Sequence, residues 1–204
     1  MPTLVKNPLR GQTLDLGVPL PCDDAAAVHI LLHSCHAYRQ TPLRSYPDLA
    51  QCCGVAEVWI KDESNRMGLG SFKALGAAYA IAREASEVGG DLSRALNNRT
   101  YVTASAGNHG LSVAAGARLF GARAVIYLSK TVPEAFADRL REKGADVIIQ
   151  GDDYQASMDA AKQAADVNGW TLLSDSSWEG YYEMPYRVME GYLMLAQEIV
   201  EQIP

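Results

Sequence analysis

Several features that mark membrane, secreted and zinc-binding proteins are missing from this 204-residue sequence. No apolar run reaches the roughly 18 residues that span a bilayer, and residues 1–8 lack the charged start and apolar segment of a secretory signal. The four cysteines form neither a CxxC pair nor a spaced cysteine–histidine set, which disfavours a metal site. We therefore expect reduced thiols, a cytoplasmic location and no membrane partner.

Positive charge is also scarce. The chain has 18 lysines and arginines against 24 aspartates and glutamates, which gives a net charge of -6. Because no basic stripe offsets this acidic balance, a nucleic-acid partner is disfavoured. The composition is ordinary for a globular protein, and the length suffices for one domain or two small lobes with a substantial core.

Hydrophobic periodicity predicts alternating strands and helices over the second half of the chain. We expect strands at 100–104, 122–128, 145–149 and 170–173, and helices at 111–120, 133–143, 154–167 and 185–200. The first half is less regular, with an irregular start (1–22), helices at 24–38 and 48–53, and a strand at 56–61. Strands that alternate with helices across short links form parallel, helix-flanked sheets, so the predicted fold class is α/β.

The stretch Lys61–Lys73 leads from a predicted strand into an alanine-rich helix. Gly68 and Gly70 punctuate the loop, and Ser71 is placed as the helix N-cap. Lys73 then falls in the first turn, where the positive end of the helix dipole and partial burial are expected to lower the pKa of its ammonium group. A lysine tuned in this way can form a Schiff base with an aldehyde cofactor. The alternative is a lysine that simply reaches into water.

A second polar stretch, Ser105-Ala-Gly-Asn-His-Gly110, separates a predicted strand from a helix. Its glycines permit a tight turn, and its backbone amides together with the helix N-terminus would make a cradle for a carboxylate or phosphate. The side chains of Ser105, Asn108 and His109 would then lie at the carboxyl edge of a parallel sheet, where such folds bind ligands. A plain strand-to-helix turn is the alternative, and His109 is either a catalytic base or only a hydrogen-bonding group.

The order of these motifs resembles the tryptophan-synthase-like, fold-type II pyridoxal-phosphate enzymes. Within that family, Lys61–Ser64, Gly70–Gly76 and Asp175–Tyr181 resemble the diaminopropionate ammonia-lyases, and the likeness runs from about Thr41 to the last residue. The resemblance implies a parallel three-layer αβα fold. It also implies that residues 1–76 belong to the larger cofactor-binding lobe, 77–174 to a small lobe with the polar turn, and 175–204 to a return into the larger lobe.

The resemblance also implies roles around the cofactor, pyridoxal 5'-phosphate. Lys73 would hold it through a Schiff base, Phe72 would pack beside it, and Asn108 would hydrogen-bond its phenolic oxygen. Asp175 matches an acidic group of the family and would serve as a base or as the partner of a substrate amine. The alternative for Asp175 is that it caps the turn before Trp178.

The same resemblance assigns the substrate end of the site to the polar turn. Ser105 and the amides of Gly107, Asn108 and His109 would bind the carboxylate of a small amino acid. The implied reaction is an α,β-elimination on a compound such as 2,3-diaminopropionate, which gives pyruvate and ammonia. Serine and threonine dehydratases carry a similar turn and are the alternative within this chemistry.

The sequence departs from the family pattern in two features. Diaminopropionate ammonia-lyases usually carry an aspartate at the position of Ala106, and because they use two acids for two enantiomers, the D-enantiomer is expected to be a poor substrate here. The family also binds the cofactor phosphate with a glycine-rich loop in its C-terminal half, for which Gly89-Gly90 is too sparse. We therefore interpret the chain as the N-terminal half of an enzyme.

Other classes of function follow from that interpretation. The chain could be a half-protein that acts as an interaction module, and we expect it to associate with a missing C-terminal half or to form a homodimer. A nucleotide-binding Rossmann domain is disfavoured because no GxGxxG follows the first strand.

Overall fold

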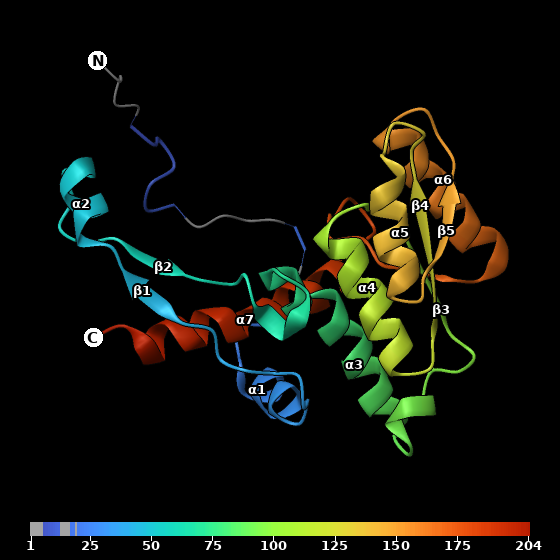
Figure 1. The fold of residues 1–204 in the computed structure, drawn as a ribbon, viewed down its shortest axis with the longest axis horizontal. Coiled ribbons are helices and arrows are strands. Elements are labelled where there is room, and N and C mark those ends of the chain that lie inside the picture. The colour runs from blue at the N-terminus through green and yellow to red at the C-terminus, as the bar shows by residue number, and fades with distance from the viewer. Residues whose placement is uncertain (1–5, 13–16, 19) are drawn as a thin grey trace.

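A computed structural model describes residues 6–12, 17–18 and 20–204. It consists of a helix-flanked sheet and a projecting arm, which are connected by the long helix α7 (Glu183–Gln202) (Figure 1). Within residues 1–22, the described part forms no helix or strand, and the rest of that stretch lies outside the described residues. Among the described residues, no helix is both long and apolar enough to cross a membrane.

The sheet has four parallel strands in the order β5-β4-β3-β6. They are β3 (Thr100–Thr103), β4 (Arg123–Leu128), β5 (Asp146–Ile149) and β6 (Thr171–Leu172). Its helices are α4 (Asn108–Leu119), α5 (Glu134–Glu142) and α6 (Tyr154–Asn168). In Figure 1, α4 and α5 cover one face and α6 covers the other. The predicted α/β class with a parallel sheet is confirmed.

Two hydrophobic cores explain this layering. Along β4, the side chains of Ala124, Ile126 and Leu128 pack in the core shared with α4 and α5, whereas Val125 and Tyr127 pack in the core shared with α6. Successive residues of a strand point to opposite faces, so a fully apolar strand must be covered on both sides.

A second group of helices packs against α4. Helix α3 (Ala77–Val88) packs on α4, and α1 (Ala26–His33) packs on α3 and α7. Gly191 of α7 allows a close approach, because an added Cβ would lie 1.9 Å from the carbonyl oxygen of Leu75. This contact fixes α7 against the 3-10 turn that carries Lys73.

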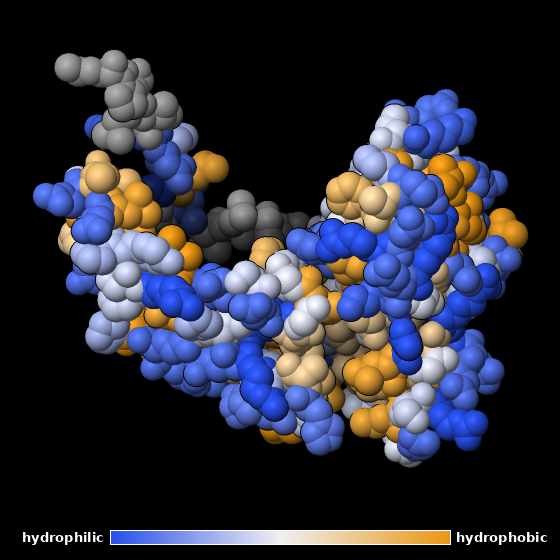
Figure 2. Space-filling view, viewed as in Figure 1, coloured by the Kyte–Doolittle hydropathy of each residue, from blue (hydrophilic) through white to orange (hydrophobic). Residues whose placement is uncertain are grey.

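The arm consists of β1 (Leu43–Ser45) paired antiparallel with β2 (Trp59–Lys61), with α2 (Pro47–Cys53) between them. Figure 2 shows the molecule hollowed between the arm and the sheet. Four large hydrophobic side chains of the arm are more than a third exposed: Tyr46, Leu49, Val55 and Ile60. A two-stranded ribbon is marginally stable by itself, so the arm depends on its attachment to α7.

That attachment is a buried ionic cluster. Glu198 of α7 is fully buried and lies 2.7 Å from Arg66 Nη1 and 2.7 Å from Lys61 Nζ. It also accepts hydrogen bonds from the Tyr38 hydroxyl and the Thr41 amide. The cluster connects the last helix to the N-terminal segment and to the arm.

Three predicted helix boundaries are wrong, and one of them is the start of α4, which is Asn108 and not residue 111. The first helix ends at His33, not near Tyr38. The helix after Lys73 begins at Ala77, because Phe72–Leu75 forms a separate 3-10 turn that ends at Gly76. Ser71 does cap a helical segment, but its hydroxyl accepts from the Lys73 amide in that 3-10 turn.

Candidate active site

Lys73 points to an acidic partner, not to bulk solvent. The 3-10 turn directs its side chain towards the segment after β6, where Nζ donates a hydrogen bond to Asp175 Oδ2 at 2.7 Å. The two side chains are 27% and 26% exposed, so the pair is only partly open to water. The structure therefore brings together the two residues predicted to be catalytic.

The electrostatics of Lys73 differ from the sequence prediction. Burial lowers the pKa of its ammonium group, as expected, but the hydrogen bond to Asp175, the nearby Tyr192 hydroxyl and the charge of Asp175 outweigh burial. The net pKa of Lys73 is raised. Burial likewise raises the pKa of Asp175, but His109 and Lys73 reverse this, so the net pKa of Asp175 is lowered. Without a ligand, the site thus holds an ammonium–carboxylate ion pair.

Asp175 is held by the turn that it belongs to and does not cap that turn. The cap is Ser174, whose hydroxyl accepts from the Ser176 amide at 3.2 Å. The Tyr181 hydroxyl accepts from the Ser174 amide and donates to the carbonyl of Leu172, which fastens the segment to β6. The carboxylate of Asp175 therefore remains available for Lys73.

The turn between β3 and α4 presents backbone amides to open space. Gly107 is the N-cap of α4, and a Cβ added there would meet nothing within 4 Å. Its amide donates to the Ser105 hydroxyl at 3.4 Å, and Asn108, the first residue of the helix, is exposed. An uncovered helix N-terminus attracts anions. The binding of a carboxylate by this turn remains a prediction.

His109 connects this turn to Asp175. Its ring is buried, and Nε2 donates to the Leu173 carbonyl oxygen at 2.8 Å. Nδ1 makes no hydrogen bond among the described residues and lies 4.0 Å from Asp175 Oδ2. Burial lowers the pKa of His109 despite the nearby carboxylate of Asp175. The ring is thus neutral with its proton on Nε2, and Nδ1 carries a lone pair and donates no hydrogen bond to Asp175. A role of His109 as catalytic base remains a prediction.

Two aromatic rings flank the lysine. Its Nζ lies 5.6 Å from the ring centroid of Phe72 and 5.8 Å from that of Tyr192. Phe72 is 41% exposed, so one ring beside the amine is open to a planar ligand. Tyr192 is a residue that the sequence analysis missed. Helical periodicity places it in α7 but cannot identify a contact across more than a hundred residues.

These residues fit the aldehyde end of pyridoxal phosphate. The amine of Lys73 has the acid of Asp175 beside it, and the ring of Phe72 next to it is exposed. The turn that carries the side-chain amide of Asn108 is open. The phosphate end has no counterpart at Gly89-Gly90. These glycines follow the C-terminal end of the 12-residue α3, which is roughly 18 Å long, whereas Lys73 lies before its N-terminal end.

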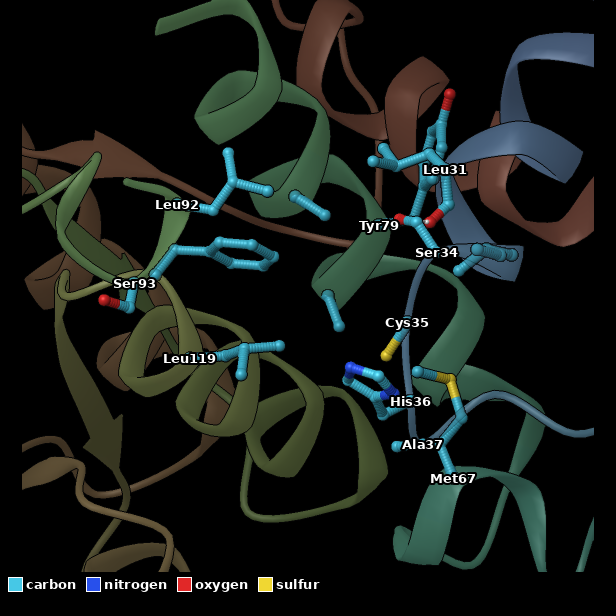
Figure 3. A pocket seen from close by; sticks show the side chains of 14 residues that line it. Leu31, Ser34, Cys35, His36, Ala37, Met67, Tyr79, Leu92, Ser93 and Leu119 are labelled. Carbon is cyan, nitrogen blue, oxygen red and sulfur yellow. Dashed lines mark hydrogen bonds between the residues drawn. The ribbon is translucent and has the colours of Figure 1, made fainter. Parts of the chain in front are cut away.

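A separate apolar cavity of about 370 Å³ lies among α1, α3 and α4. Figure 3 shows Leu92 and Leu119 on one side and Cys35, His36 and Met67 on the other. None of the predicted site residues lines this cavity. It belongs to the packing of the helices and not to the chemistry around Lys73.

The ion pair leads to a first prediction. Changing Asp175 to Asn removes the carboxylate but keeps the size of the side chain, so the effect of burial on Lys73 is opposed only by Tyr192. We expect the neutral amine to become more abundant and Lys73 to be methylated about tenfold faster by formaldehyde and cyanoborohydride, since a hydrogen bond to a charged group is lost. Mass spectrometry gives the rate relative to exposed Lys130.

The matched control for this prediction is Asp146→Asn, which makes the same change of charge at an exposed pair with Arg123. In this variant, the rate at which Lys73 is methylated should equal that of the wild type. A slower or unchanged rate in Asp175→Asn would show that the carboxylate does not hold the ammonium.

Comparison with known proteins gives a consistent result. Residues 35–204 match the family described as pyridoxal-phosphate dependent enzyme. The chain is 39% identical to diaminopropionate ammonia-lyase of Escherichia coli (strain K12) over 176 residues, which cover 81% of this chain and 44% of that enzyme. It is 31% identical to L-threonine ammonia-lyase of Thermotoga maritima over 148 residues, or 72% of this chain and 33% of that enzyme.

The fold is shared as well. The crystal structure of holo diaminopropionate ammonia-lyase from Escherichia coli matches with a TM-score of 0.81 and 36% identity, covering 88% of this chain and 49% of that chain. This confirms the predicted fold type. The chain spans about 44% of the length of the curated relative that it matches in E. coli.

Proposed function

The chain belongs to the pyridoxal-phosphate-dependent enzyme family, and from this premise we propose that it carries the lysine half of an ammonia-lyase active site. The proposed reaction converts a small amino acid such as 2,3-diaminopropionate, with one water, into pyruvate and two molecules of ammonia. The observation that carries the proposal is the hydrogen bond between Lys73 and Asp175 beside the open turn of α4.

The residues of this chain take separate parts in that reaction. Lys73 would hold the cofactor, and Phe72 would cover one side of it. The side-chain amide of Asn108 would donate a hydrogen bond to the phenolic oxygen of the cofactor. Bound pyridoxal phosphate supplies an electron sink for the pair of electrons left when a bond at Cα breaks. Lys73 must lose its proton to bind an aldehyde, and Asp175 is the nearest group that can accept it.

Substrate binding falls to the turn between β3 and α4. The hydroxyl of Ser105 and the amides of Gly107, Asn108 and His109 would hold the substrate carboxylate at the positive end of the helix. Asp175 would then either move the Cα proton or pair with the amine at Cβ. The ring of His109 lies beside this carboxylate, with Nδ1 4.0 Å from Oδ2, and makes no hydrogen bond to it.

The substrate preference is a second prediction. Ala106 offers no acid for the second enantiomer, and a missing general acid or base typically costs about a hundredfold or more in rate. With pyridoxal phosphate added, we expect L-2,3-diaminopropionate to yield pyruvate about a hundredfold faster than the D-enantiomer. Pyruvate formation coupled to lactate dehydrogenase measures both rates, and Ala106→Asp should raise the rate with the D-enantiomer.

Parallel assays separate the alternatives. Turnover of L-serine or L-threonine in preference to diaminopropionate would support a dehydratase, whose turn resembles Ser105–Gly110. Equal turnover of both enantiomers would contradict the role given to Ala106. A chain that neither turns over these amino acids nor captures pyridoxal phosphate would support the interaction module instead.

Association with a second copy or with the remainder of a longer enzyme is part of the proposal. The exposed hydrophobic side chains of the arm support it, because the arm has little core of its own. The division at residues 76 and 174 into parts of two lobes is likewise a proposal. A cytoplasmic location is supported by four free cysteines, of which Cys22, Cys52 and Cys53 are exposed.

A further inference from the structure

Tyr192 carries a buried hydroxyl that makes no hydrogen bond of normal geometry among the described residues, although it lies close enough to Lys73 to raise the pKa of that ammonium group. The hydroxyl lies where a side chain at position 76 would be, since a Cβ added to Gly76 would come within 2.5 Å of it. Leaving a buried polar group without a partner costs roughly 1–3 kcal/mol. Such a group needs an explanation in the ligand-bound or reacting state.

The surroundings of the hydroxyl suit a cation. The ring of Tyr192 packs edge-on against Phe72, with centroids 5.2 Å apart. The ammonium of Lys73 lies within 6 Å of both centroids, the range in which aromatic faces attract cations. The same side chain can therefore reach either the carboxylate of Asp175 or the aromatic pair on α7 and the 3-10 turn.

We propose that Tyr192 and Phe72 form a second binding position for the Lys73 ammonium, which the lysine occupies when Asp175 is engaged elsewhere. The phenolic oxygen accepts a hydrogen bond from Nζ there, and the two rings attract its charge. Tyr192 is thus a positioning residue that acts through Lys73. The use of this position rests on the proposed function, in which Lys73 is released from the cofactor while Asp175 serves the substrate.

Without a second position, the released lysine would be a partly buried ammonium with no free carboxylate beside it. The charged or titratable groups that face it are Asp175 after β6, His109 of α4 and Tyr192 of α7. His109 is neutral and directs Nε2 to a backbone carbonyl. The acceptors left once Asp175 is taken are therefore His109 Nδ1 and the Tyr192 hydroxyl, and of these two Tyr192 belongs to the pair of rings that already lies within 6 Å of Nζ.

A double-mutant cycle tests the inference without the cofactor. Asp175→Asn removes the first position, and Tyr192→Phe removes only the hydroxyl of the second. The readout is the rate of formaldehyde methylation of Lys73 relative to Lys130 at one mildly alkaline pH. We expect Tyr192→Phe to change this rate less than about twofold in the wild type, but to raise it about tenfold in the Asp175→Asn background.

Controls separate this role from a structural one. Tyr101→Phe removes another buried hydroxyl, whose partner is Glu84, and should leave the rate of Lys73 methylation unchanged in both backgrounds. Because the Tyr192 hydroxyl has no partner, its removal should not lower the unfolding midpoint, whereas removal of the Tyr101 hydroxyl should. Asp175→Ala serves as a second background if Asp175→Asn does not fold.

An equal effect of Tyr192→Phe in both backgrounds, including no effect, overturns the inference. A lowered unfolding midpoint in Tyr192→Phe also overturns it, because the hydroxyl would then be a structural group. Failure of the wild-type chain to capture pyridoxal phosphate contradicts the proposed function. It leaves the cycle interpretable, since formaldehyde and not the cofactor reports on Lys73.

Discussion

Replacing Lys73 with alanine is expected to abolish the saturable covalent adduct between the chain and pyridoxal phosphate. Lys73 combines an acid that can take its proton with an exposed aromatic ring beside the amine. Lys130 has an acid partner in Asp152, and Lys162 lies over the ring of Trp178, but neither has both among the described residues. Lys61, by contrast, is 6% exposed and bound to Glu198. Borohydride reduction followed by peptide mass spectrometry should place the adduct on Lys73 in the wild type and find none above background in Lys73→Ala.

Two variants make this experiment specific. Lys73→Arg keeps a cation for Asp175 but cannot condense with an aldehyde, so it should fold normally and form no adduct. Lys130→Ala removes an exposed lysine that is 67% accessible and should retain the full adduct. A saturable adduct of the same yield in Lys73→Ala would remove the basis of the proposed function.

The regular part of the fold follows from local patterns. The strands of the sheet were predictable because fully apolar runs such as Ala124–Leu128 must be buried on both faces, and helix ends were marked by glycines. Gly54 and Gly144 end their helices at positive φ, which glycine adopts without strain. These signals lie within a few residues of the element that they define, so sequence alone contains them.

The electrostatics of the site could not be predicted in the same way. The expected low pKa of Lys73 came from its position at a helix start, but the decisive partner, Asp175, lies 102 residues away. A short-range charge pair outweighs the partial charge of a helix end. The open hydroxyl of Tyr192 was missed for the same reason. The roles of Ser105, Gly107 and Asn108 come from the family resemblance and remain predictions.

The largest expected effect on folding is at Glu198, where a change to alanine should lower the free energy of unfolding by about 3–5 kcal/mol. The loss has a definite cause, because Arg66 and Lys61 would be left in a buried site with Glu63 as the only carboxylate bonded to Arg66. Urea denaturation followed by circular dichroism measures the change. Glu201→Ala, in the same helix but exposed, should cost less than about 0.5 kcal/mol.

The same carboxylate gives the unfolding free energy a defined pH dependence. Burial raises the pKa of Glu198, but hydrogen bonds from Arg66, Lys61 and Tyr38 outweigh burial and hold it at about 2, against 4.5 ordinarily. A depressed pKa contributes stability that is complete above the unfolded-state value and is lost as the pH falls through the folded-state value. We therefore expect about 3 kcal/mol to disappear between roughly pH 5 and pH 2 in the wild type. Glu198→Ala should lack this contribution. If the free energies of unfolding of the wild type and of Glu198→Ala fell in parallel with decreasing pH, the buried glutamate would not be ionised.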